Sequence, residues 1–201
     1  MLTVELLLFD QVDLLDVGGP YEVLLTANRL AARDGEPAPF EVRTVATAEE
    51  VVAYGGLGLR PSHALDLDAP VDVLVVPGAV DLDAAATAEA TIARRAAHAD
   101  LVTSVCTGSV LLARAGVLDA PAATTHHEDL DLLREVAPGA AVHRAPWVDA
   151  GAVITAGGLS SGLALGLRLV HRLVSRDLAV RTATQIEHPW DPEDGVVHVS
   201  P

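Results

Sequence analysis

Residues 101–113 have the sequence Leu-Val-Thr-Ser-Val-Cys-Thr-Gly-Ser-Val-Leu-Leu-Ala. The first five form a short run rich in β-branched and apolar residues, which is typical of a buried strand. The run Val110–Ala113 is apolar and begins a segment with helical spacing. The turn between them holds Cys106, the single cysteine of the chain. This pattern predicts a strand, a sharp turn carrying a thiol, and a helix.

The same alternation of strand and helix extends along the whole chain. Strands are predicted at about 3–9, 40–45, 71–76, 101–105 and 152–155, and helices at 82–98, 107–115, 127–136, 160–174 and 177–186. An earlier helix is predicted with Pro20 at its first position and Gly35 just past its end. Residues 51–59 predict a hairpin or bulged edge, and 187–201 an irregular tail. We therefore expect an α/β sandwich with a mostly parallel sheet, formed as a single domain by residues 1–201.

Composition excludes several classes of function. The 201 residues include 13 Lys+Arg and 28 Asp+Glu, a net charge of -15, which disfavours nucleic-acid and membrane-surface partners. No apolar stretch approaches the ~20 residues needed to cross a bilayer. Lysine is absent, which excludes Schiff-base and P-loop lysine chemistry. The lone cysteine and an N-terminus without a basic region before its apolar run predict a cytoplasmic protein.

Candidate catalytic residues follow the predicted strands, because ligands of open parallel sheets bind beyond the carboxyl ends of the strands. Backbone N–H groups and a helix dipole at the turn should lower the pKa of Cys106 and make it a nucleophile. Asp16 is expected in the loop after the first strand, either as a proton donor or acceptor with a raised pKa or as a helix cap. The N–H groups of Gly78 and Thr107 could form an oxyanion hole, although Gly78 also fits a simple turn.

Three other patterns have a structural explanation that we favour. Residues Gly158–Gly162 match the G-x-S-x-G pattern of serine hydrolases, but Ser160 or Ser161 also fits a helix N-cap. The run His126–Asp129 suggests a metal site, yet adjacent histidines are expected to point apart, so we predict no metal. His126 alone could reach the cysteine pocket. Trp147 and Trp190 are interpreted as packing or interface residues.

Five motifs in order resemble the DJ-1/PfpI superfamily, and within it the isonitrile hydratase branch. They are 16–22 (Asp-Val-Gly-Gly-Pro-Tyr-Glu), 75–78 (Val-Val-Pro-Gly), 103–109 (Thr-Ser-Val-Cys-Thr-Gly-Ser), 123–126 (Ala-Thr-Thr-His) and 154–157 (Ile-Thr-Ala-Gly). The resemblance implies a flavodoxin-like three-layer sandwich, similar to class I glutamine amidotransferases. It also implies a homodimer with the site near the interface, no metal or organic cofactor, and Gly19 as a pocket residue.

The resemblance further implies a reaction on a small molecule. Cys106 would attack the terminal carbon of an isonitrile while Asp16 supplies a proton, and water would release an N-substituted formamide. Thr107 would orient the cysteine and the adduct. Many relatives have histidine at the position of Thr107, so protease activity is disfavoured. Ala164, where relatives tend to have Asp, and His127, where Trp is common, also depart from the pattern and bear on pocket shape and substrate.

Alternatives to the hydratase remain open. A glyoxalase-like or other cysteine-dependent hydrolase or hydratase would use Cys106 on a carbonyl carbon. A non-enzymatic redox or stress-response protein would instead sense oxidants through Cys106. A ligand-binding regulator is less expected, because a DNA-binding module has no room after Pro201.

Overall fold

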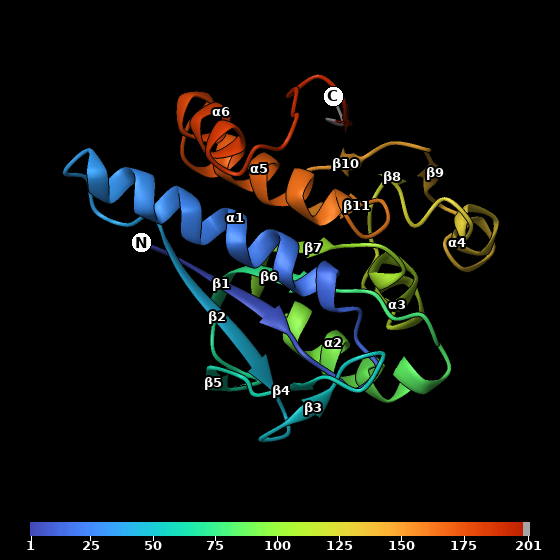
Figure 1. Cartoon of the computed structure of the whole chain (residues 1–201). Helices are drawn as coiled ribbons and strands as arrows, with labels where there is room; N and C mark the ends of the chain where they lie inside the picture. Colours follow the sequence, from blue (N-terminus) through green and yellow to red (C-terminus); the bar gives the residue numbers. More distant parts are fainter. Residues whose placement is uncertain (199–201) are drawn as a thin grey trace.

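The computed structural model describes residues 1–198 (Figure 1). Within these residues the main sheet has eight strands in the order β12-β10-β11-β7-β6-β1-β2-β5. Their bounds are β1 Leu2–Leu7, β2 Phe40–Ala46, β5 His63–Ala64, β6 Val71–Val76, β7 Ala99–Ser104, β10 Trp147–Asp149, β11 Val153–Ala156 and β12 Val196–Val197. Every described pair of neighbours in this sheet is parallel except β10 with β11. The predicted α/β fold with a mostly parallel sheet is confirmed.

The central parallel strands have the flavodoxin-like order. Numbered along the chain, β1, β2, β6, β7 and β11 lie in the sheet as 2-1-3-4-5. The order reverses between β1 and β6, and in such sheets ligands bind outside the carboxyl ends of the strands at that point. The segments that follow β1, β6 and β7 therefore form the most favourable place for a site.

Helices cover both faces of the sheet (Figure 1). On one face α1 (Leu14–Arg33), α5 (Ser161–Leu173) and α6 (Arg176–Gln185) pack against one another. On the other lie the 3₁₀ helix η1 (Ala84–Ala88), α2 (Glu89–Ala96) and α3 (Gly108–Arg114), with α4 (Leu130–Val136) against α3. Residues 1–198 also contain two small ribbons, β3 (Val51–Val52) with β4 (Gly58–Leu59) and β8 (Ala122–Ala123) with β9 (Ala141–Val142).

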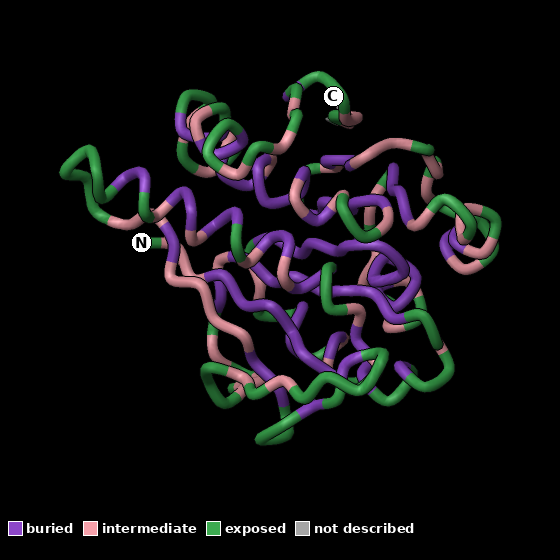
Figure 2. Tube along the Cα trace, viewed as in Figure 1, coloured by how far each residue is buried: buried purple, intermediate pink, exposed green. Residues whose placement is uncertain are grey.

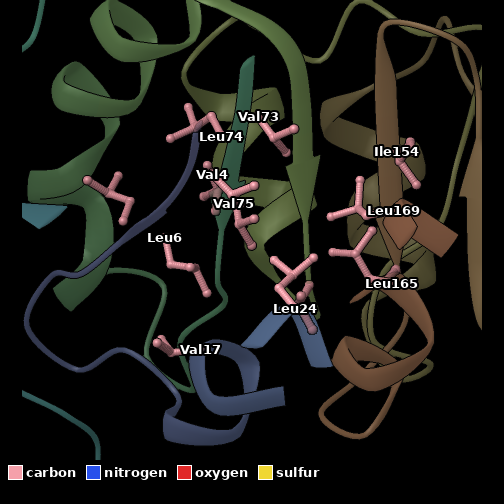
Figure 3. Packing of buried hydrophobic residues seen from close by; sticks show 14 of the residues in the cluster. Val4, Leu6, Val17, Leu24, Val73, Leu74, Val75, Ile154, Leu165 and Leu169 are labelled. Carbon is pink, nitrogen blue, oxygen red and sulfur yellow. The ribbon is translucent and has the colours of Figure 1, made fainter. Parts of the chain in front are cut away.

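The sheet is buried between the helical layers (Figure 2). Val4 and Leu6 of β1 and Val73 and Val75 of β6 are 1% exposed or less. Figure 3 shows such strand side chains in one cluster with Leu24 of α1 and with residues of α5 and β11. Strands buried on both faces need nearly continuous apolar runs, which is why these strands could be recognised in the sequence.

The start of the first helix was predicted wrongly. α1 begins at Leu14, with Asp13 at the N-cap position, so Pro20 lies inside the helix. The close contact between α1 and α5 explains this. A Cβ on Gly162 would lie 3.0 Å from Cδ of Pro20, and one on Gly19 would lie 3.2 Å from the Gly162 carbonyl carbon. Tertiary packing thus holds a helical turn that proline alone would disfavour.

Several other boundaries differ from the prediction. The helix expected at 82–98 is divided into η1 and α2, and α4 begins at Leu130 instead of 127. The tail contributes β12, which pairs with β10, while residues 199–201 of the predicted tail lie outside the described residues. Gly35 follows the C-cap of α1 with a φ of 79°, as predicted, and residues 51–59 form the expected hairpin. Of the helices in residues 1–198, none is both long and apolar enough to cross a membrane.

Candidate active site

Cys106 lies in the sharp turn that the sequence predicted between β7 and α3. Its φ is 56°, in the left-handed region that few residues other than glycine adopt. Its backbone N–H donates to the carbonyls of Ala156 (3.2 Å) and Gly157 (2.8 Å). Its carbonyl accepts a hydrogen bond of 3.0 Å from Oγ1 of Thr125. These contacts with β11 and the loop after β8 hold the backbone in its strained conformation.

Gly108 makes this turn possible. A Cβ at this position would collide with the carbonyl oxygen of Val76 and lie 3.0 Å from that of Pro77. The turn after β7 therefore packs directly on the end of β6. This contact brings Cys106 close to the segment 77–79.

Asp16 lies in the first turn of α1, with its carboxyl group next to the thiol of Cys106. It is not in a loop or at a helix cap, the two positions expected from the sequence. The side chain is fully buried, and its Oδ2 accepts a hydrogen bond of 2.9 Å from the Gly78 N–H. Burial raises the pKa of Asp16 from 3.8 to about 7, with a further increase from the charge of Asp13. Hydrogen bonds from the Gly78 N–H and from the neighbouring thiol of Cys106 lower the pKa of Asp16, but by less than burial raises it. The carboxyl group can therefore gain or lose a proton near neutral pH.

The pKa of the Cys106 thiol is raised to about 12, so the expected lowering of this pKa is wrong. Burial is the largest cause, and the negative charge on Asp16 adds to it. The backbone N–H groups of Thr107 and Leu159 face the sulfur and lower the pKa, but less than burial raises it. The resting cysteine is a thiol, and it must lose its proton during a reaction for which the adjacent carboxylate is a suitable acceptor.

The predicted oxyanion hole is only partly present. The N–H of Gly78 is bound to Asp16, so this half of the prediction is wrong. The Thr107 hydroxyl donates to the Ala79 carbonyl (2.8 Å) and accepts from the Ala79 N–H (2.9 Å). It therefore holds the loop after β6 and does not orient the cysteine. The backbone N–H groups that face the sulfur belong to Thr107 and to Leu159, a residue that the sequence did not indicate.

A cavity of about 300 Å³ opens beside Cys106. Its lining combines apolar and acidic groups: Asp13, Ala79, Val80, Leu82, Cys106, Thr107, His126, Glu128, Asp129 and Leu159. His126 thus lies in the cysteine pocket, as its position in the sequence suggested. Asp13, the N-cap residue of α1, also lines it.

Gly19 does not line this cavity and packs against the backbone of α5, so the expectation for Gly19 is wrong. Ala164 is likewise buried in α5, where it offers no carboxylate to a ligand. A second cavity of about 460 Å³ shares His126 and Leu159 with the first and extends past His127 and Arg144.

The serine hydrolase pattern has a packing explanation. Ser160 precedes α5, and His171 lies in the last turn of the same helix. At 1.5 Å per residue the two are separated by roughly 15 Å along the axis, so they cannot form a catalytic pair. Gly162 of the motif permits the approach of Pro20. Trp147 is fully buried in β10 and stacks under the Arg168 guanidinium, as expected for a packing residue.

The histidine pair differs from its prediction. The rings of His126 and His127 do not point apart, because their centroids are 4.4 Å apart and their planes are tilted by 46°. Nδ1 of His126 lies 3.8 Å from Oε2 of Glu128 and 3.5 Å from Oδ2 of Asp129. The loop between β8 and α4 folds back on itself, so that His126, Glu128 and Asp129 line the cysteine pocket while His127 lines the second cavity.

These features agree with the comparison with known proteins. The DJ-1/PfpI family model matches residues 3–172, so the chain belongs to the DJ-1/PfpI family. A curated relative, an isonitrile hydratase from Pseudomonas putida, is 36% identical over 202 residues, covering 96% of this chain and 82% of the relative.

Other relatives include a regulator and a solved structure. The HTH-type transcriptional regulator GbdR from Pseudomonas aeruginosa is 29% identical over 177 residues, covering 86% of this chain but only 47% of the regulator. A crystal structure of a ThiJ/PfpI family protein from Pseudomonas syringae superposes with a TM-score of 0.79 at 27% identity, covering 96% of this chain and 77% of that chain. The family therefore includes both enzymes and regulators.

Proposed function

We propose that this protein is a cysteine-dependent isonitrile hydratase, a hydro-lyase that converts an isonitrile and water into an N-substituted formamide. The observation that carries the proposal is the buried pair of Cys106 and Asp16, in which the carboxyl group has a pKa of about 7. The 36% identity to the Pseudomonas putida isonitrile hydratase supports it. Residue 107 is threonine and its hydroxyl is bound to Ala79, so it offers no base for peptide hydrolysis.

The first step adds the thiol across the terminal carbon of the isonitrile, R–N≡C. The Asp16 carboxylate accepts the thiol proton, the sulfur forms a bond to the terminal carbon, and the proton passes to that same carbon. The product is the thioimidate R–N=CH–S–Cys106, and Asp16 returns to its ionised form. A carboxyl group with a pKa near 7 is suited to both transfers, because it can hold or release a proton at neutral pH. Since the pKa of the thiol is higher, its proton is transferred as the sulfur bonds to carbon and not beforehand.

The second step is hydrolysis of the thioimidate. Water adds to the C=N bond, with its oxygen on carbon and a proton on nitrogen, and gives R–NH–CH(OH)–S–Cys106. Loss of the hydroxyl proton through Asp16 forms the carbonyl of R–NH–CHO, while the C–S bond breaks and the sulfur regains a proton. The N–H groups of Thr107 and Leu159, which face the sulfur, are placed to stabilise the thiolate leaving group.

The pocket also fits a small substrate of this class. An isonitrile has no charge and a slender reactive end, and the apolar residues Val80, Leu82 and Leu159 line the cavity where its substituent would lie. The volume of about 300 Å³ is at the lower end for small-molecule sites. A cavity of this size favours compact alkyl or aryl groups.

The test is a product assay with matched variants. Purified wild type, Cys106→Ala and Asp16→Asn are incubated with a panel of alkyl and aryl isonitriles, and the N-formamide is followed by chromatography. Wild type should form the formamide, Cys106→Ala should form none above the uncatalysed reaction, and Asp16→Asn should lose at least about a hundredfold in rate, the usual contribution of general acid–base catalysis. Ser109→Ala, which removes a hydrogen bond to the Cys106 carbonyl but no proposed reacting group, serves as the matched control.

Absence of formamide from wild type would reject the hydratase. The same preparations would then be assayed with methylglyoxal for glyoxalase-like activity, and by mass spectrometry under mild peroxide for oxidation of Cys106. The raised pKa of the thiol argues against an oxidant sensor, because thiolates are the reactive form. The homodimer expected from the family resemblance stays a prediction, which sedimentation can test.

A further inference from the structure

We propose that the loop following β8 binds one zinc ion through His126, His127 and Glu128, with Asp129 as the fourth ligand, at the mouth of the cysteine pocket. This site is separate from the proposed reaction, in which zinc takes no part. Bound zinc would restrict access to Cys106 and so regulate it.

The spacing of the candidate ligand atoms fits a tetrahedral ion. One ligand atom from each of His126, His127 and Glu128 can be chosen so that all three lie within 4.8 Å of one another. Nδ1 of His126 is 3.8 Å from Oε2 of Glu128 and 3.5 Å from Oδ2 of Asp129. Two ligands bound at about 2.0–2.1 Å to a tetrahedral zinc ion are roughly 3.3 Å apart. For His126, His127 and Glu128, movements of a few tenths of an ångström to about 1.5 Å would bring the ligand atoms to this spacing. Oδ2 of Asp129 already lies near this distance from Nδ1 of His126.

The loop is held in the conformation that gathers these groups. The Asp129 N–H donates to the His126 carbonyl at 2.9 Å, which closes the turn. The Glu128 N–H lies 3.4 Å from Nδ1 of His126, which keeps the backbone of residue 128 beside this ring. Thr125, the preceding residue, is tied to the Cys106 carbonyl. The loop and the cysteine turn are therefore linked directly.

The set of donors selects the metal. Two imidazole nitrogens with carboxylate oxygens suit zinc, whereas magnesium and calcium prefer oxygen ligands alone. Two carboxylates and two neutral imidazoles would offset the ion's double positive charge. Asp13, which lines the same cavity, adds negative potential that favours a cation.

The site overlaps the entrance to the thiol. His126, Glu128 and Asp129 line the cavity that contains Cys106, and the Cys106 residue is only 7% exposed. An ion held by these three side chains would draw them together over the opening. Reagents that reach the sulfur through this cavity should then react more slowly.

Zinc binding to the full chain can be measured by isothermal titration calorimetry with zinc chloride at neutral pH. We expect one zinc per wild-type chain, and at least tenfold weaker binding to His127→Ala and to Glu128→Gln, since even outer contacts of metal ligands contribute tenfold or more. Both residues are exposed, so these variants should fold normally. His98→Ala is the matched control, because Nε2 of His98 also lies 3.8 Å from a carboxylate oxygen, Oδ1 of Asp68, but His98 is outside the proposed ligand set.

Cys106→Ala distinguishes this site from zinc bound to the thiol and should bind zinc as tightly as wild type. Zinc should also slow alkylation of wild-type Cys106 by iodoacetamide, an effect reversed by EDTA and weakened in His127→Ala. The proposal is overturned if wild type binds no stoichiometric zinc, if His127→Ala and Glu128→Gln bind as wild type does, or if Cys106→Ala loses the ion. None of these readouts depends on isonitrile hydration.

Discussion

Burial of Asp16 should make the stability of the protein depend on pH in a defined direction. The pKa of the carboxyl group is raised from 3.8 to about 7, so the folded state binds this proton more tightly than the unfolded state does. The resulting stabilisation is complete below pH 3.8 and is lost as the pH rises through about 7. At about 1.4 kcal/mol per pH unit, the loss amounts to about 4 kcal/mol.

Asp16→Asn removes this dependence, because asparagine does not titrate and its amide oxygen can still accept the Gly78 hydrogen bond. Relative to wild type, the variant should gain about 4 kcal/mol of unfolding free energy between pH 4 and pH 9. The amide NH₂ placed at the buried Oδ1 position adds a cost that is the same at both pH values, so it cancels in the comparison. In a chain of this length the gain corresponds to roughly 8–16 °C in Tm.

The assay is urea denaturation of wild type and Asp16→Asn at several pH values between 4 and 9. The difference between the two proteins should change steadily from about pH 4 and level off near pH 7, the folded-state pKa of Asp16. Asp13→Asn should move the start of this plateau to lower pH, because the charge of Asp13 raises the pKa of Asp16. Parallel stability curves across this range would refute the assignment of a raised pKa to Asp16.

Three further results are expected. If Asp16 must be ionised to accept the thiol proton, kcat/KM for isonitrile hydration should rise with pH through about 7 and level off above it. A kcat/KM that does not change over that pH range would contradict this role. Gly108→Ala should lower the unfolding free energy by about 3 kcal/mol in urea denaturation, since its Cβ collides with the Val76 carbonyl; an unchanged midpoint would mean that the turn can relax. Thr107→Val should lower the unfolding free energy by about 1–3 kcal/mol, because the Ala79 N–H and carbonyl lose their hydrogen-bond partner. Thr107→Ser keeps the hydroxyl and should lower it less. If both variants lose the same unfolding free energy, these hydrogen bonds are not the cause.

Much of the fold was predictable because its signals are local. Central strands such as β1 and β6 are buried on both faces and need apolar runs. The turn at Cys106 directly follows another central strand, β7. Helix boundaries were less predictable. Pro20 suggested a helix start, but contacts with α5, more than a hundred residues later, extend α1 back to Leu14.

The sequence by itself determined the α/β class, the elbow that carries Cys106 and the presence of Asp16 near the same sheet edge, since each follows from short stretches of residue pattern. Only the tertiary structure decided how these groups behave. The Gly78 N–H that binds Asp16 is 62 residues away along the chain, and burial by distant segments raises the pKa of both Asp16 and Cys106. Desolvation and hydrogen-bond geometry depend on which remote segments meet in space, and a local pattern carries no information about those contacts.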